Sequence, residues 1–152
     1  MEENNIVGCI AVQADQSEEE THFLLQCATE YPFIKGVVGW VNLMSDDVRE
    51  KLPYFSMKKL FKGVRHILQN EEKDFVLQEK FQNGIACLSD FNHTYDILIY
   101  PYQIENVIQL VKKFPKQKFV LDHLAKPYIK SKKNKEVENR NKRTCQLPKR
   151  SL

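Results

Sequence analysis

Residues 94–123 read TYDILIYPYQIENVIQLVKKFPKQKFVLDH, which predicts a strand, a helix and a second strand in succession. The first run, 94–100, is rich in β-branched and aromatic residues, as is typical of a buried strand. The apolar side chains of the helix at 103–114 share one face: Ile104, Val107, Ile108 and Val111. Pro115 ends this helix, and 118–123 is the next apolar strand. Apolar strands on both sides of an amphipathic helix are typical of a parallel sheet covered by helices.

The same alternation extends from this unit back to the N-terminus. Earlier strands are expected at three apolar runs: 6–12, 34–41 and 61–68. A helix is expected to start at Ser17, because Glu20 stands at the spacing of a capping box. A short helix opens at 45–47 and is interrupted by Pro53, and Asp74 caps another helix. Expected strands thus start every 24–33 residues, the length of a strand, a helix and two short loops.

Two parallel folds fit this pattern, a doubly wound open sheet and a (β/α)₈ barrel, and hydrophobic periodicity does not choose between them. Several chemistries lack their sequence signals. There is no G-x-G-x-x-G after the first strand and no G-x-x-x-x-G-K-[ST], so a phosphate-binding loop has no support. There is no G-x-S-x-G, so a serine hydrolase is not expected.

Composition divides the 152 residues into an acidic body and a basic tail. Residues 130–152 hold nine Lys or Arg and two Glu, so residues 1–129 carry 14 basic and 18 acidic side chains. The tail has little to bury and is expected to be disordered. Because it lacks interleaved aromatic residues, nucleic-acid binding is not expected. No apolar run reaches the ~20 residues of a membrane span, and four scattered cysteines favour a reducing, cytoplasmic location.

Polar residues that could carry chemistry gather where the expected strands end, which is where parallel α/β folds place their sites. These residues are Gln13, Trp40, Asn42, Arg65, His66, Gln69, Asp122 and His123. Arginine suits a carboxylate or a lactone carbonyl, and histidine can bind a metal or move a proton. Each also has a structural alternative. Arg65 could pair with Asp96 on the next strand, and His66 could be a hydrogen-bonded spacer. Trp40 could belong to the core, and Asp122 could orient His123.

Six segments together resemble the amidohydrolase-related family, in particular the lactone hydrolases related to fuconolactonase and pyrone-dicarboxylate lactonase. They are VQA around Gln13, EETHFLL at 19–25, GVVGWVNL at 36–43, GVRHILQNE at 63–71, YDILIYPYQI at 95–104 and FVLDHLAKP at 119–127. The resemblance covers residues 6–129 in collinear order.

This resemblance implies a (β/α)₈ barrel that hydrolyses a lactone with a divalent metal, zinc or manganese. The strands would correspond to the second to sixth of the barrel. His123 would be the active-site and metal-binding histidine, Arg65 and His66 would face the substrate, and Gln13 and Trp40 would line its pocket. From their places after the strands, we add Asp122 as a second catalytic candidate and Gln69 as a substrate-binding candidate.

The chain also departs from the family pattern. No H-x-H first strand precedes Ile6, and no seventh strand or eighth-strand G-S-D-W-P-like segment follows Pro127. We therefore expect a partial barrel domain at 1–129 that, alone, neither holds a metal tightly nor hydrolyses a lactone. The alternative is a non-catalytic truncated isoform or binding module that self-associates through open sheet edges.

Overall fold

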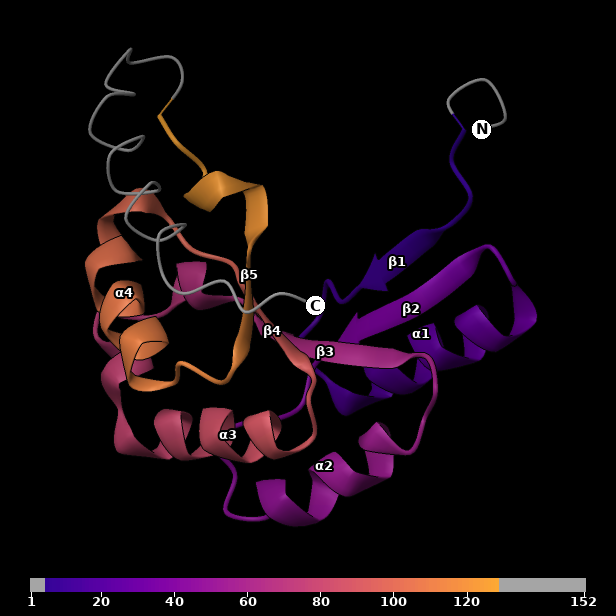
Figure 1. Ribbon diagram of the computed structural model, residues 1–152, viewed down its shortest axis with the longest axis horizontal. Helices are drawn as coiled ribbons and strands as arrows, with labels where there is room; N and C mark the ends of the chain where they lie inside the picture. The colour runs from indigo at the N-terminus through magenta and orange to yellow at the C-terminus, as the bar shows by residue number, and fades with distance from the viewer. Residues whose placement is uncertain (1–4, 129–152) are drawn as a thin grey trace.

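The computed structural model describes residues 5–128, which form one parallel five-stranded sheet (Figure 1). The strands are β1 (Cys9–Val12), β2 (Ile34–Gly39), β3 (Phe61–His66), β4 (Thr94–Ile97) and β5 (Lys118–Leu121). They lie in the order β1-β2-β3-β4-β5, and every neighbouring pair is parallel. A doubly wound sheet reverses its strand order at a switch point. This sheet runs on in one direction, as successive strands of a barrel do.

Four helices cover the sheet: α1 (Glu18–Glu30), α2 (Val48–Ser56), α3 (Glu79–Asp90) and α4 (Ile104–Lys113). Figure 1 shows all four on the same, convex side of the curved strands. Short 3₁₀ turns lie at Leu68–Asn70, Phe75–Leu77, Pro101–Gln103 and Asp122–Ala125. Aromatic side chains fill much of the core between the two layers, with Phe81 in edge-on contact with Tyr95. The core lies between the sheet and these helices, so the side chains on the concave face of the sheet lie outside it.

Local signals set the start of α1 and its fit against the sheet. The Ser17 side chain accepts the Glu20 backbone N–H at 3.2 Å, as expected. The Glu20 carboxylate, however, accepts the N–H groups of Ala14 and Asp15 rather than completing the capping box. Gly39 permits close approach, because a Cβ there would lie 2.4 Å from a Thr21 side-chain carbon of α1.

Two helix predictions were wrong in detail. Pro53 lies inside α2 instead of interrupting it, and the helix continues because Leu52 and Phe55 are buried against the core. Asp74 makes no side-chain cap bond. The chain after it forms a 3₁₀ turn, and α3 begins only after Gln78.

The strands at the two sides of the sheet expose apolar side chains. Ile10 and Val12 of β1 are 49% and 37% exposed, and Val120 of β5 is 43% exposed. Each of these strands pairs on one side only within the described residues. Unpaired strand edges beside apolar surface favour association with further strands. No helix in the described part of the chain is long and apolar enough to cross a membrane.

Candidate active site

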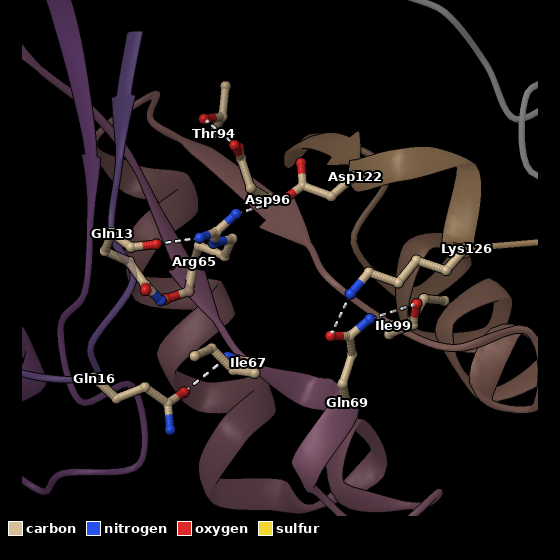
Figure 2. Close-up of polar contacts among 10 residues, drawn as sticks. All are labelled: Gln13, Gln16, Arg65, Ile67, Gln69, Thr94, Asp96, Ile99, Asp122 and Lys126. Carbon is tan, nitrogen blue, oxygen red and sulfur yellow. Dashed lines mark hydrogen bonds and ion pairs between the residues drawn. The ribbon is translucent and has the colours of Figure 1, made fainter.

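Polar side chains from three separate strands meet at one end of the sheet (Figure 2). Gln13 directly follows β1, Arg65 is in β3, and Asp122 directly follows β5. The strands are parallel, so their carboxyl ends lie at the same edge, as the sequence predicted. Arg65 is the centre of the group, since its bonds reach both Gln13 and Asp122.

Gln13 and Arg65 are joined across the intervening strand β2. The Gln13 side-chain amide donates to the Arg65 carbonyl at 3.0 Å. In return, the Arg65 guanidinium donates through Nη2 to the Gln13 carbonyl. Gln13 is fully buried. It therefore acts in this structure as a brace between β1 and β3.

The partner of Arg65 is Asp122, at 3.0 Å between Nη1 and Oδ2, with both side chains largely buried. The alternative pairing with Asp96 is wrong, although Asp96 is the register partner of Arg65 on β4. The Asp96 carboxylate instead accepts a hydrogen bond from the Thr94 hydroxyl at 3.1 Å. Asp122 directly follows β5, at the start of the 3₁₀ turn Asp122–Ala125.

Asp96 is a buried carboxyl beside a second carboxylate. Burial and the nearby negative charge of Asp122 raise the pKa of Asp96 to about 6, against the lowering effects of the Thr94 hydrogen bond and the Arg65 charge. Asp96 is 7% exposed. It can therefore hold a proton close to neutral pH, which the sequence did not indicate.

His123 stands on an unusual turn rather than at the end of a strand. The expected strand 118–123 ends at Leu121, and residues 123–126 all have positive φ, of 49°, 53°, 59° and 48°. Left-handed backbone costs roughly 1–2 kcal/mol for each residue with a side chain. The His123 side chain is exposed. Its carbonyl accepts the Lys126 N–H at 2.9 Å, which closes the turn.

Gln69 lies beside this turn. Its side-chain oxygen accepts the Lys126 ammonium at 3.1 Å, and its amide donates to the Ile99 carbonyl at 3.4 Å (Figure 2). Gln69 thus connects the segment after β3 with the turn after β5. The sequence placed Gln69 among the substrate-binding residues, and that role stays a prediction.

His66 and Trp40 form a separate group. The Trp40 indole donates to His66 Nδ1 at 3.3 Å, and His66 Nε2 lies 2.9 Å from a Glu71 carboxylate oxygen. The indole can only donate, so His66 carries its proton on Nε2 and donates it to Glu71. The His66 ring also stacks on Phe75, with 5.0 Å between ring centroids. Successive strand residues face opposite sides, so His66 points away from Arg65 towards the helices.

Some residues at this end of the sheet escaped sequence reasoning. Gln16 accepts the Ile67 N–H at 2.7 Å and so fixes the segment after β3, and Lys126 ties the turn to Gln69. Their signal was weak, because glutamine and lysine are common surface residues.

Asn42 is exposed, and its side chain accepts the Met44 N–H at 3.1 Å.

The described residues do not supply a metal site of their own. Among residues 5–128, no group of three His, Cys, Asp or Glu side chains could hold a metal ion. A catalytic zinc needs about three protein ligands. The Asp122 carboxylate is bonded to Arg65, and both His66 nitrogens have partners. Of the metal ligands predicted from the sequence, His123 remains, and one ligand does not make a metal site among residues 5–128.

Sequential parallel strands with polar side chains at their carboxyl ends define a (β/α)-barrel arrangement. The chain belongs to the amidohydrolase family, whose model matches residues 5–143. It is 36% identical over 122 residues to an L-fucono-1,5-lactonase of Burkholderia multivorans, covering 79% of this chain and 41% of that protein. It is 28% identical over 123 residues to an L-fucono-1,5-lactonase of Burkholderia ambifaria, covering 80% and 42%.

Solved structures agree with this assignment. An amidohydrolase from Burkholderia multivorans with bound zinc superposes with a TM-score of 0.91 at 29% identity, over 97% of this chain and 53% of that one. The same amidohydrolase with bound HEPES gives a TM-score of 0.90 at 30% identity, over 97% and 54%. These neighbours are (β/α)₈ barrels, which confirms the barrel prediction. The chain spans about half the length of the relatives it matches.

Proposed function

We propose that this chain contributes the central strands of a lactone-hydrolysing barrel, in which water attacks the carboxylic ester of a lactone in the full-length protein. The observation that carries the proposal is the Gln13–Arg65–Asp122 group with His123 beside it, at the carboxyl ends of the strands. Barrel enzymes place their active sites at this face. The likeness to Burkholderia L-fucono-1,5-lactonases supports a neutral sugar lactone as the substrate class.

His123 is the proposed catalytic group of this half. Its imidazole is exposed, and an imidazole is the side chain that most often serves as a general acid or base. Asp122 is the neighbouring residue that the sequence placed in the same role, and its carboxylate bonds Arg65. Asp96 gives the concave face a second proton-holding group.

A divalent metal belongs to the proposal only for a longer protein. The described donors do not fit zinc or manganese, so no step of our account passes through a metal. The bound zinc in the Burkholderia amidohydrolase supports metal binding by full-length members. We expect further ligands to come from other strands, and the 152-residue chain alone to hydrolyse a lactone no faster than buffer.

The proposal is tested with a chimera in which residues 5–128 replace the matching segment of the Burkholderia multivorans lactonase. We expect the folded chimera to hydrolyse L-fucono-1,5-lactone well above the spontaneous rate, measured by proton release. A chimera that folds, by circular dichroism and gel filtration, but has no activity would contradict the proposal.

The exposed apolar side chains on β1 and β5 favour one second function, a non-catalytic module that associates through its sheet edges. Sedimentation velocity of the 152-residue chain tests it. A dimer that dissociates when Val12 and Val120 are both changed to Lys would favour this function, and a monomer at all concentrations would exclude it. The basic residues 130–152, considered for nucleic-acid binding, lie outside the described residues.

A further inference from the structure

Four consecutive left-handed residues at 123–126 are the most strained backbone in the described chain. None of the four is glycine, the residue that adopts this conformation without a steric cost. Single left-handed residues occur at turns, but a run of four does not persist unless its surroundings hold it. The turn therefore needs identifiable restraints.

Restraints are present at both ends of the turn. Immediately before it, Asp122 is held by the Arg65 guanidinium at 3.0 Å. At its last residue, Lys126 is held by Gln69 at 3.1 Å. Between them, Ala125 is fully buried. Both holding side chains come from the same part of the fold, β3 and the 3₁₀ turn that follows it.

The contacts and the burial of the Arg65 side chain favour a positioning role over direct contact with a substrate. Its Nη1 bonds Asp122, its Nη2 bonds the Gln13 carbonyl, and its Nε is buried without a partner among the described residues. Only 13% of the side chain is exposed. The bonds that the guanidinium makes go to protein groups, and little of its surface is left for a substrate.

We infer that Arg65, through Asp122, and Gln69, through Lys126, are positioning residues that hold the left-handed turn and thereby fix where His123 stands. This inference rests on the proposed function, in which His123 is the catalytic group. We call the Arg65–Asp122 and Gln69–Lys126 interactions the two ties of the turn. Losing either tie frees one end of the turn, and the backbone relaxes towards ordinary right-handed or extended conformations. His123 then samples many positions without any change in its own chemistry.

The ties can be broken one at a time with substitutions that keep side-chain shape. Asp122→Asn removes the charge that Arg65 holds, and Lys126→Met removes the ammonium but keeps the stem. Matched controls are Asp46→Asn and Lys80→Met, which break an exposed ion pair between α3 and the segment before α2. Amide hydrogen exchange by mass spectrometry on the 152-residue chain measures the peptide 119–126, with residues 94–97 of β4 as the internal reference.

We expect each tie-breaking variant to speed exchange in 119–126 by at least about tenfold, and the controls and the β4 peptide to be unchanged. The ring resonance of His123, observed by NMR, should broaden or shift in the same variants. Combining Arg65→Gln with Asp122→Asn should add little to the single change, because both remove one tie. Unchanged exchange and an unchanged His123 resonance in the folded variants would overturn the inference.

The outcomes also separate this inference from the proposed function. An inactive chimera together with faster exchange in 119–126 would reject the function and keep the positioning role. An active chimera together with unchanged exchange would keep the function and reject the positioning role. If Asp122→Asn unfolds the whole chain, seen as faster exchange in β4, Lys126→Met decides the outcome because its side chain is at the surface.

Discussion

Gln13 and Arg65 exchange two hydrogen bonds across strand β2, each using its side chain to bond the other's carbonyl. This exchange joins β1 to β3 without any direct backbone pairing between these strands. It also explains why a glutamine stands fully buried at the end of an apolar strand. The arginine it braces is the one that reaches across to Asp122 after β5.

Replacing Gln13 should destabilise the fold. Gln13→Leu keeps the volume but removes the donor to the Arg65 carbonyl, and an unsatisfied buried group costs about 1–3 kcal/mol. Urea unfolding followed by circular dichroism measures this loss. Gln26→Leu on α1 is the matched control, since Gln26 is exposed and its side chain donates to the Glu30 carboxylate at 2.8 Å. Equal stability of the two variants would argue against the brace.

Asp96 should make the chain less stable as the pH rises from about 4 to about 6. Its pKa is raised from 3.8 to about 6 in the folded state, so the folded chain binds this proton more tightly than the unfolded chain within that window. Asp96→Asn removes the ionisation and should raise the melting temperature at pH 7.5 but not at pH 3.5. The groups that face Asp96 are Asp122, Arg65 and Thr94. Equal pH profiles for wild type and variant would contradict this assignment.

His93 should have the opposite effect to Asp96 on how the stability of the fold depends on pH. Burial lowers the pKa of His93 below its usual 6.5, and its Nε2 lies 3.0 Å from the Ser56 hydroxyl. The unfolded chain therefore takes up the proton first, and this contribution to stability is lost as the pH falls below about 6.5. NMR titration should give His93 a pKa below 6.5. A higher pKa at His93 would reject the buried environment.

Trp40 reports on His66, because it is the only tryptophan in the sequence. Its indole donates to His66 Nδ1, so His66→Phe should leave the indole N–H without that acceptor. We expect a changed emission maximum and intensity in the folded variant. His22→Phe is the control and should leave the emission as in wild type, because the His22 ring packs against Tyr54 and Phe55 of α2. Identical spectra for all three proteins would exclude the contact.

Sequence reasoning predicted the elements better than their spatial arrangement. Apolar runs and caps located all five strands and the helix after Pro101, because these signals are local. Local patterns did not choose between an open sheet and a barrel, because strand order is a non-local property; the family resemblance implied the barrel, and the strand order agrees with it. The continuation of α2 through Pro53 depended on burial of Leu52 and Phe55, which no local pattern shows.

The candidate site was predictable to a similar degree. The shared edge of parallel strands predicted that Arg65 and Asp122 lie at the same end of the sheet, but the sequence offered Asp96, not Asp122, as the partner of Arg65. The sequence did not show which of the neighbours Arg65 and His66 faces the candidate site. That depends on the face of β3 that each side chain occupies, and His66 faces the helices. The left-handed turn at 123–126 had no signal, since no glycine marks it.

The most direct test of the central claim compares kcat/KM for L-fucono-1,5-lactone in the chimera and in its His123→Ala and His22→Ala variants. Loss of a proton-transferring group costs about 10²–10⁴ in rate. We predict a loss in that range for His123→Ala and wild-type kcat/KM for His22→Ala, with both variants folded. Undiminished hydrolysis by the His123→Ala chimera would contradict the account.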